Sequence, residues 1–587
     1  MSLFTRLRHS PAPDEVTADK PVTDDDSASR RPAPRRLRAL RGLRAKYPRA
    51  ARVLARSGTV LAVVAVLFAL LMPGNVAYFE PKQFLRIPAE AILGAALLMV
   101  LPRRPRRIAA VVMGVGLALV VALKLLDMGF RQFLGRDFDP VLDWGLLDDA
   151  TSYLQDTAGR TGALGAVVGA VVLLLLLLAG LTLAVLRIAG LMARNRRTAV
   201  RTVVTAGAVW ITCSALGLQL LGTTPVAARN TVALVEARGK GVRAALRDEA
   251  AFAKEARKDA FADVPPDQLL TALRGKDVIF AFVESYGRTA IEDEATAPGV
   301  GAVLDAGTES LREAGYSARS GWLTSATYGG SSWLGHSTFL TGLWIDNQNR
   351  YRTVTNSERL SLPGAFARTG AWRTVGVMPG VQKNWPEGRF YGFDRVYDSR
   401  DLGYRGPKFS WSTMPDQYAL TAFERLEHGR EQDKPLMSQL ILTSSHQPWA
   451  PLPKMVDWAD VGDGSVYEDI EKAGKDPAKV FSDSTEVKQE YGESIQYSMR
   501  SLVEYVERYG TDDTVLVVLG DHEPVARVSG DDGGRDVPIS IVAHDPDVLD
   551  RIQDWGWADG LTPGEDTPVW RMDAFRDRFL TAYGPGR

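Results

Sequence analysis

Two adjacent serines, Ser331 and Ser332, follow a pair of glycines in the stretch TYGGSSWLGHSTFLTG, residues 327–342. Glycine permits a sharp turn and serine is favoured where a helix begins, so the pattern predicts a turn that leads into a helix. The positive potential at a helix N-terminus suits a hydroxyl that acts on an anion, and a capped helix without chemistry is the alternative. His336 lies one helical turn after Ser332 and faces either the same pocket or the core.

Three further stretches place polar side chains at the ends of predicted strands. Asp521 and His522 follow the apolar run in DTVLVVLGDHEP, where the glycine allows a bend that turns both side chains toward one cavity. A carboxylate oxygen and an imidazole nitrogen are standard ligands of Zn²⁺ or Mn²⁺, so this pair predicts a metal site. Glu284, in DVIFAFVESYGR, is either a functional carboxylate or a solvated strand end. His446, after LILTSS, is either a surface histidine or one that binds or protonates a leaving oxygen.

The elements that must position these side chains lie in residues 267–587, where short apolar runs alternate with helical patterns. The runs are DVIFAFVE, PLMSQLILTSS, DTVLVVLGD and VPISIVAHD. Such alternation favours an α/β domain with a largely parallel central sheet, in which ligands bind at the carboxyl ends of the strands. Upstream, the segment Asn230–Ala262 is rich in Ala, Arg and Glu and lacks Pro. It predicts a helical spacer that ends before Pro265.

The first half of the chain contains apolar segments long enough to cross a bilayer, which takes roughly 20 residues. The segments are Ser57–Phe79, Phe84–Leu101, Ile108–Leu126, Thr161–Leu186 and Thr202–Leu221. The second segment gives the weakest signal, because Pro88 and Glu90 lie inside it. The pattern therefore predicts a bundle of five transmembrane helices.

The charges around these segments predict their orientation. Residues 1–56 carry fourteen Lys or Arg against six Asp or Glu, a composition typical of a disordered basic tail. The loops after the second and fourth segments are also basic, whereas the loop over 127–160 holds seven Asp and three Arg. By the positive-inside rule the tail is cytoplasmic, and five crossings place everything after Leu221 outside. This alternation of loop charge argues against the alternative of buried helices in a soluble core.

Several classes of function are disfavoured by composition. The formal net charge is zero, so the bulk charge indicates no nucleic-acid partner. The single cysteine, Cys213, allows no intrachain disulfide, and it supplies neither a Cys-based metal site nor a cysteine nucleophile to the later part of the chain. One acidic residue within the apolar segments offers little for the substrate pathway of a transporter.

Taken together, these motifs resemble the alkaline phosphatase and sulfatase superfamily, and in particular its lipoteichoic acid synthase branch. The resemblance implies five transmembrane helices followed by an extracellular catalytic domain. It implies that Glu284, Asp521 and His522 are metal ligands and that His446 binds substrate. In sulfatases the nucleophile lies ten residues before the glycine of a Thr-Gly pair, which here favours Ser332 and keeps Ser331 in reserve.

Two details refine what the resemblance implies. The stretch NWPEGRFYGFDRVYD is similar to a substrate segment of the family, with Trp385 and Arg389 as candidates, although the family spacing between Trp and Arg is shorter. An aromatic core loop with a surface arginine is the alternative. The residues after Ser332 lack the Pro or Ala and the Arg of the sulfatase pattern, so formylglycine and sulfate-ester hydrolysis are disfavoured. A serine hydroxyl activated by a divalent cation fits phosphate chemistry instead.

The sequence therefore predicts a membrane-anchored, metal-dependent phosphotransferase or phosphohydrolase of the cell envelope. Ser332 attacks a phosphate ester as a fourth metal ligand, and one divalent ion, Mn²⁺ or Zn²⁺ with Mg²⁺ as a further option, activates it. The resemblance implies a lipid donor and a glycolipid or polysaccharide acceptor. A sulfatase-like hydrolase and a degenerate membrane scaffold are the alternatives, and the sequence leaves the oligomeric state open. The predicted domains are a cytoplasmic tail over 1–56, the five-helix membrane domain over 57–222, a helical linker over 223–264 and an extracytoplasmic α/β, alkaline-phosphatase-like catalytic domain over 265–587.

Overall fold

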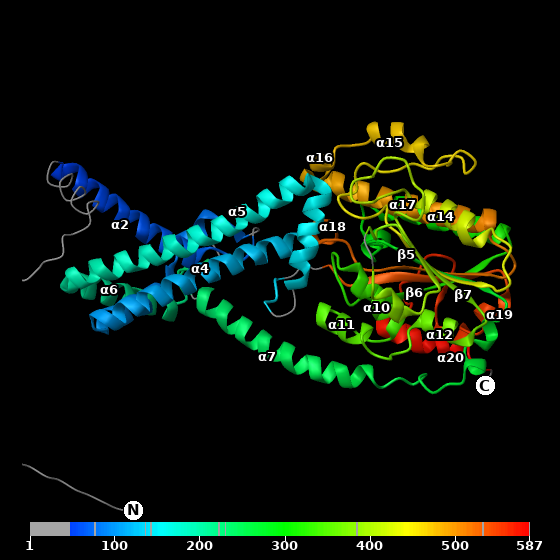
Figure 1. Ribbon diagram of the computed structural model, residues 1–587, viewed down its shortest axis with the longest axis horizontal. Helices are drawn as coiled ribbons and strands as arrows, with labels where there is room; N and C mark the ends of the chain where they lie inside the picture. The colour runs from blue at the N-terminus through cyan, green and yellow to red at the C-terminus, as the bar shows by residue number, and fades with distance from the viewer. Residues whose placement is uncertain are drawn as a thin grey trace, which may run out of the picture.

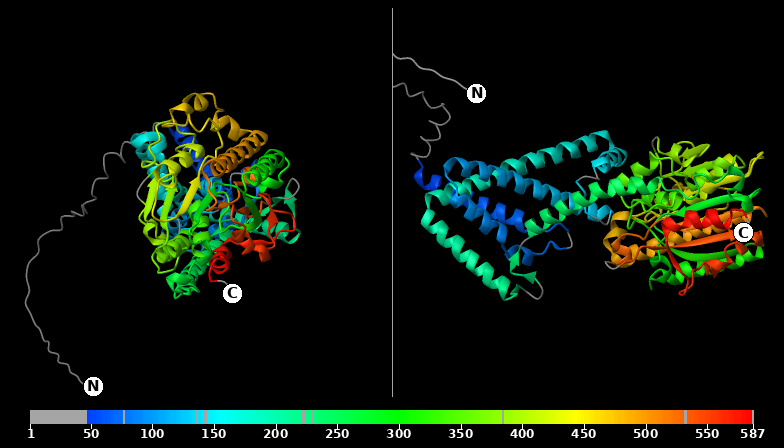
Figure 2. Two further views of the ribbon diagram at one scale, coloured as in Figure 1. Left: turned by 90° about the vertical axis from the view of Figure 1, so that its right-hand side faces the viewer. Right: turned by 90° about the horizontal axis from the view of Figure 1, so that it is seen from below.

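A computed structural model describes most of the chain. The described residues are 47–75, 78–134, 137–140, 144–220, 224–228, 230–382, 385–530 and 533–585. They form a helical bundle and a separate sheet domain, which one long helix connects (Figure 1). Figure 2 shows the same arrangement end-on and from below. Most of the predicted basic tail lies outside the described residues, and its last part belongs to the first described helix.

Four helices of the bundle are long and apolar enough to cross a membrane. They are α2 (Pro48–Leu71), α4 (Arg103–Leu134), α5 (Trp144–Arg194) and α6 (Arg196–Ala215). Two of the five predicted segments, Ile108–Leu126 and Thr161–Leu186, lie wholly within α4 and α5, and most of Ser57–Phe79 and Thr202–Leu221 lies within α2 and α6. The predicted bundle of helices able to cross a membrane is therefore confirmed, except that the second predicted segment forms only a shorter apolar helix.

The predicted span over Phe84–Leu101 is wrong in its length. It folds as the end of a 3-10 turn, η2 (Pro81–Leu85), a two-residue strand, β1 (Ile87–Pro88), and the 12-residue helix α3 (Ala89–Val100). At 1.5 Å per residue α3 is about 18 Å long, which is shorter than the roughly 30 Å hydrocarbon core. Pro88 disfavours a helical conformation for the residue before it, so the helix begins only after the proline.

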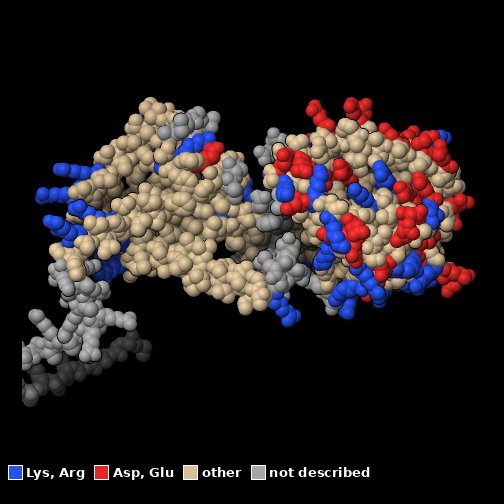
Figure 3. All heavy atoms as spheres, turned by 90° about the horizontal axis from the view of Figure 1, so that it is seen from above, with Lys and Arg blue, Asp and Glu red and all other residues tan. Residues whose placement is uncertain are grey.

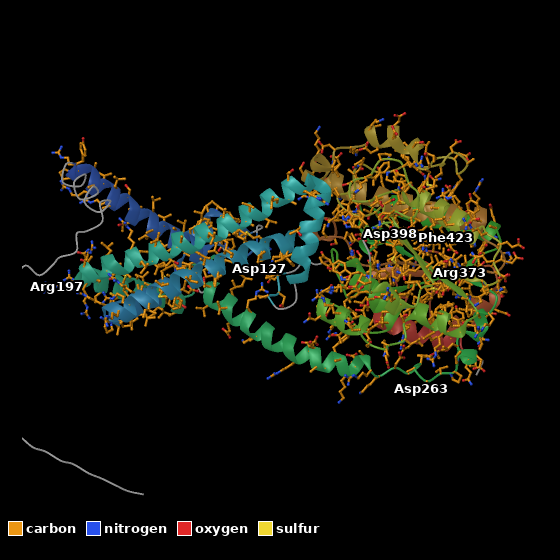
Figure 4. All side chains as sticks on the ribbon, in the orientation of Figure 1. Asp127, Arg197, Asp263, Arg373, Asp398 and Phe423 are labelled. Atoms are coloured by element: carbon orange, nitrogen blue, oxygen red, sulfur yellow. The ribbon has the colours of Figure 1, made fainter. Side chains whose placement is uncertain are left out.

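A group of charged residues lies where the bundle meets the connecting helix, α7 (Asn230–Ala256), and we call Glu90, Lys124, Asp127 and Arg238 the junction cluster. Glu90 of α3 accepts hydrogen bonds of 3.0 Å from two backbone N–H groups in the first turn of α7. Lys124 of α4 donates to two of the last carbonyls of α2 (3.2 and 3.4 Å). Asp127 of α4 pairs with Arg238 of α7 at 2.6 Å. Asp127 lies at the end of the bundle that faces the sheet domain (Figure 4).

The helix α7 covers most of the predicted spacer over 230–262 and ends at Ala256. Its C-terminal part packs against α11 (Gln348–Thr355) of the sheet domain. Arg350 donates to both carboxylate oxygens of Asp248 (2.8 and 2.5 Å). Phe252, which is 1% exposed, packs into an apolar cluster of the sheet domain. The connecting helix is therefore held at both of its ends.

The sheet domain is built on nine strands in the order β12-β6-β11-β10-β5-β9-β7-β8, with β13 pairing to β6. The strands are β5 (Asp277–Val283), β6 (Ser317–Thr324), β7 (Arg373–Met378), β8 (Arg395–Asp398), β9 (Leu436–Leu442), β10 (Thr514–Gly520), β11 (Asp536–Ala543), β12 (Ala558–Asp559) and β13 (Val569–Arg571). The five strands from β10 to β8 are parallel, and β11 is antiparallel to both of its neighbours. The predicted largely parallel sheet is confirmed, with β11 and the two-residue β12 running in the opposite direction.

Helices cover both faces of this sheet, as Figure 1 shows. One face packs against α9 (Ala297–Glu313), α14 (Asp416–Phe423) and α17 (Ser484–Tyr509). The other face packs against α10 (Ser332–Thr341), α12 (Leu362–Thr369) and α20 (Phe575–Ala582). Alternate residues of β5 enter the two cores, as the two-residue period of a strand requires, which explains why β5 is apolar from Val278 to Val283.

Candidate active site

The register of the three central strands brings their carboxyl ends to one edge of the sheet. Val283 of β5 is paired with Gly520 of β10 on one side and with Leu442 of β9 on the other. The residues that follow these strands therefore begin at the same level. Gly520 is required here for space, because a Cβ at this position would lie 1.8 Å from the carbonyl oxygen of Tyr286.

Glu284, Asp521 and His522 meet at this edge, and we call them the metal cluster. One ligand atom from each lies within 4.8 Å of the others, and all three side chains are buried. His522 Nε2 lies 3.2 Å from Glu284 Oε1 and 3.8 Å from Asp521 Oδ1. The three residues that the sequence predicts as ligands are thus close enough to share one ion.

The hydrogen bonds of His522 fix which ring nitrogen faces the cluster. Nδ1 lies 2.8 Å from the carbonyl oxygen of Glu523, which can only accept, so Nδ1 carries a proton and Nε2 faces Glu284. Burial on its own lowers the pKa of His522, but the charge of Asp521 and the hydrogen bond with Glu284 outweigh it and raise the pKa to about 9. Burial on its own raises the pKa of Glu284, but the hydrogen bond and charge of His522 lower it well below its ordinary value. The two buried carboxylates thus favour a positive charge between them.

The donor set fits a divalent cation. Asp521 Oδ1 accepts hydrogen bonds of 2.8 Å from the backbone N–H groups of Ser285 and His522. Asp521 Oδ2 is buried and has no hydrogen-bond partner among the described residues. A buried carboxylate oxygen without a donor is costly, and a metal ion is one group that removes this cost. Two carboxylates and an imidazole suit Mn²⁺ or Zn²⁺ better than Ca²⁺.

Of the two candidate serines, Ser332 is the one that contacts the metal cluster. It is the first residue of α10, and its Oγ donates to Glu284 Oε2 at 2.9 Å and lies 3.1 Å from His522 Nε2. Ser331 caps the helix in a left-handed conformation (φ 66°), which is uncommon for a residue other than glycine. Among the described residues, the Ser331 hydroxyl makes no hydrogen bond to the cluster.

His446 lies in the loop after β9, directly after Ser445, whose hydroxyl donates to the backbone carbonyl of Glu284 at 2.6 Å. Nδ1 of His446 lies 2.6 Å from the carbonyl oxygen of Gln447, which can only accept, so Nδ1 carries a proton. Burial is the main cause that lowers the pKa of His446. The indole of Trp411 stacks on its imidazole, with ring centroids 3.8 Å apart and planes 12° from parallel.

Trp411 and Asp416 are site-supporting residues that the sequence analysis missed. The Asp416 carboxylate accepts hydrogen bonds from the backbone N–H groups of Thr443 (2.7 Å) and Ser444 (3.0 Å), and so holds the loop that carries His446. Burial raises the pKa of Asp416 to about 6. The segment FSWSTMPD has no periodic pattern, and its only signal is an aromatic residue in a loop rich in Ser and Pro.

The structure gives Trp385 and Arg389 no contact with the metal cluster among the described residues. Trp385 donates through Nε1 to the Tyr351 hydroxyl (3.1 Å) and stacks on Tyr391, with ring centroids 5.3 Å apart. Arg389 lies in the short helix α13 (Gly388–Tyr391) with an exposed side chain. These contacts are those of an aromatic core loop with a surface arginine, and a role in substrate binding stays a prediction.

His336 lies on α10 next to the cluster and is buried (8% exposed). Its Nε2 is 3.3 Å from Asp521 Oδ2, and its ring packs on Phe282, with centroids 4.4 Å apart. The two alternatives from the sequence thus both describe part of its surroundings, because one edge of the ring faces the site and one face meets the core.

No family model matches the chain, and no curated protein is significantly similar to it. Solved structures that are similar include the lipoteichoic acid synthase LtaP from Listeria monocytogenes (16% identity, TM-score 0.35, covering 55% of this chain and 74% of that one). The phosphoglycerol transferase GacH of Streptococcus pyogenes has 13% identity and a TM-score of 0.34, covering 55% of this chain and 78% of that one. An alkaline phosphatase superfamily protein from Vibrio parahaemolyticus has 17% identity and a TM-score of 0.30, covering 50% and 68%.

Proposed function

We propose that this chain is a membrane-anchored, metal-dependent phosphotransferase or phosphohydrolase with Ser332 as its nucleophile. The observation that carries the proposal is the position of Ser332 Oγ, 2.9 Å from Glu284 Oε2 and 3.1 Å from His522 Nε2 at the start of a ten-residue helix. A hydroxyl between buried metal-ligating side chains and a helix N-terminus is placed for attack on a phosphate ester.

The residues that would hold the ion are Glu284, Ser332, Asp521 and His522. When bound, a divalent cation lowers the pKa of a coordinated hydroxyl and neutralises phosphate charge. The hydrogen bond from Ser332 to Glu284 Oε2 gives the serine proton an acceptor as the hydroxyl oxygen forms its bond to phosphorus. The backbone N–H groups in the first turn of α10 bind a phosphoryl oxygen.

The bond between phosphorus and the leaving oxygen breaks as the phosphoseryl ester forms. His446 gives a proton to the leaving oxygen through Nε2, because its Nδ1 is bonded to the Gln447 carbonyl. Burial lowers the pKa of His446, so this step draws on the minority of the protein in which the ring carries both protons near neutral pH. A second hydroxyl then attacks the phosphoseryl group and gives its proton to His446 Nε2. The bond between phosphorus and Ser332 Oγ breaks, and the proton held by Glu284 returns to the serine oxygen. An acceptor alcohol as the attacking group makes the protein a transferase, and water makes it a hydrolase.

The proposed donor is a glycerophospholipid, and the proposed acceptor is a glycolipid or polysaccharide of the envelope. Four helices that are able to cross a membrane lie in the same chain as the site, which supports a substrate drawn from the bilayer. Basic side chains gather at the end of the bundle farthest from the sheet domain (Figure 3), and Arg197 lies there (Figure 4). By the positive-inside rule this end is cytoplasmic, which supports an extracytoplasmic active site.

The test uses the full chain in detergent micelles with a fluorescent phosphatidylglycerol and Mn²⁺. We expect release of diacylglycerol, abolished by Ser332→Ala, and a phosphoserine at position 332 in protein quenched during turnover and examined by mass spectrometry. Ser331→Ala is the matched control and should keep most of the activity. Equal activity of Ser332→Ala and the unaltered protein would overturn the assignment, and a protein that binds no divalent ion would favour the scaffold alternative.

A further inference from the structure

His336 has a position that the proposed chemistry does not use. It follows Ser332 by one turn on α10, and this helix lies very close to the strand end that carries the metal cluster. A Cβ at Gly335 would lie 2.8 Å from the carbonyl oxygen of Asp521, so only a glycine before His336 permits this approach. The ring of His336 is held on its other side by Phe282 of β5. The imidazole is therefore fixed beside Asp521.

Two polar atoms without hydrogen bonds face each other across this contact. His336 Nε2 and Asp521 Oδ2 are 3.3 Å apart, both atoms are buried, and neither has a hydrogen-bond partner among the described residues. The other oxygen, Asp521 Oδ1, already accepts two backbone hydrogen bonds. A buried polar atom left unpaired destabilises the fold, so a function is expected for the pair.

We propose that His336 is a positioning residue of the metal centre. Its Nε2–H donates to Asp521 Oδ2 and sets the angle at which this carboxylate meets the ion. His336 is not itself a ligand, because the group of ligand atoms that all lie within 4.8 Å of one another contains Glu284, Asp521 and His522 and does not include it. The inference rests on the proposed function only in taking that group as the metal site.

The expected effect follows from how such partners act. Groups that hydrogen-bond to metal ligands fix the orientation of these ligands, and their loss typically weakens metal binding by about 10–100-fold. His336→Leu keeps the apolar contact with Phe282 but removes the donor. His336→Gln keeps an N–H donor at nearly the same distance from the backbone. The leucine variant should therefore lose metal affinity, and the glutamine variant should recover most of it.

The experiment measures Mn²⁺ affinity of the full chain in detergent by competition with a chelator, with no substrate present. We expect about 10–100-fold weaker binding for His336→Leu and a loss of less than about fivefold for His336→Gln. The matched control is His544→Leu, which removes a histidine that also faces an aspartate, with Nε2 3.5 Å from Asp512 Oδ1, at a half-exposed position away from the site. This control should bind Mn²⁺ like the unaltered protein.

Pulsed electron paramagnetic resonance of the Mn²⁺ complex separates positioning from ligation. One coordinated imidazole nitrogen, unchanged in His336→Leu, supports the proposal, whereas a second coordinated imidazole that disappears in this variant overturns it. Unchanged affinity of His336→Leu also overturns it and leaves the proposed function standing. If the unaltered protein binds Mn²⁺ no better than Asp521→Ala does, the metal site fails and both proposals fail with it.

Discussion

Two groups of charged residues in the described part of the chain, the junction cluster and the metal cluster, differ in how their charges are balanced. In the junction cluster, Asp127 is paired with Arg238 at 2.6 Å, and Lys124 binds backbone carbonyls at the end of α2. In the metal cluster, the carboxylates of Glu284 and Asp521 share the single histidine His522. An unpaired carboxylate oxygen is common to both groups, because Glu90 Oε2 and Asp521 Oδ2 both lack a hydrogen bond among the described residues. The junction cluster balances its charges within the protein. The metal cluster has more carboxylates than cationic groups, and a bound cation can neutralise the difference.

This difference distinguishes a structural role from a chemical one. A balanced buried group stabilises the fold, and removing one partner is expensive because the other is left uncompensated. A buried group with excess charge of one sign destabilises the fold unless a ligand binds, so removing one of its charges costs binding rather than stability. Variants in the two clusters should therefore have opposite consequences.

The largest effect is expected for Asp521→Asn in the metal cluster. The amide oxygen can still accept from the backbone N–H groups of Ser285 and His522, but the variant lacks a charged ligand. We expect more than about 100-fold weaker Mn²⁺ binding and loss of activity, with a free energy of unfolding of the metal-free protein that is unchanged or higher. Chelator competition and denaturant unfolding in detergent measure the two quantities. A less stable metal-free variant would contradict the comparison.

A similar charge removal in the junction cluster should affect stability instead. Arg238→Met leaves the carboxylate of Asp127, which is 2% exposed, without its partner, so we expect a loss of about 3 kcal/mol in the free energy of unfolding. Mn²⁺ affinity should not change. The double variant Asp127→Asn/Arg238→Met should regain most of the stability, and a double variant as unstable as Arg238→Met would show that the pair does not interact as described.

Asp416 is a third kind of buried carboxylate, with hydrogen bonds but no paired cation. Its pKa is raised from 3.8 to about 6 by burial, so the folded protein holds this proton when the unfolded chain has released it. The free energy of unfolding should therefore fall as the pH rises from about 4 to about 6, by at most about 3 kcal/mol for this group. Asp416→Asn should lack this contribution. Thermal unfolding at several pH values measures the difference, and parallel curves for the two proteins would refute it.

The smallest effect is expected for Trp411→Ala, which changes the site without changing any charge. Loss of the stacked indole frees the His446 ring, at a cost of about 0.5–1.5 kcal/mol or up to about tenfold in kcat/KM. Mn²⁺ affinity and stability should stay near those of the unaltered protein, and Trp411→Phe should keep most of the activity. A loss of metal binding in Trp411→Ala would show that the metal cluster also depends on Trp411, and it would contradict the expected separation between the His446 ring and the metal cluster.

The parts of the site that the sequence predicted are those carried by local patterns. Asp521 and His522 directly follow an apolar run, so their place at a strand end needed no knowledge of the fold. Glu284 follows another such run, and the parallel register of β5 and β10 brings the two together. The position of Ser332 at the start of a helix was likewise predicted from the glycines and serines around it.

The parts that the sequence did not predict depend on contacts between distant residues. Asp127 and Arg238 are 111 positions apart, and neither stretch has a pattern that points to the other. The stack of Trp411 on His446 arises only when two loops meet above the sheet. The reversed direction of β11 was also hidden, because an apolar strand buried on both faces reads the same in either direction.

The helical bundle also shows where prediction from the sequence fails. The hydropathy of Phe84–Leu101 predicts a span, yet α3 has 12 residues and its Glu90 accepts hydrogen bonds from the start of α7. A carboxylate inside an apolar run weakens a predicted span, but it does not reveal the helix terminus that it binds. The long uninterrupted segments carried no such conflict, and helices are found there.

The burial of Phe252 has a practical consequence for separating the sheet domain from the helical bundle. Phe252 packs with Leu334, which is two residues after Ser332, so the apolar support of the nucleophile helix comes partly from the connecting helix. A secreted fragment that begins at residue 265 would lack this support, and it would also lack Asp259, whose carboxylate pairs with the fully buried Arg576 at 2.9 Å. Limited proteolysis in α7 should therefore release a soluble, active fragment only when the cut falls before Phe252.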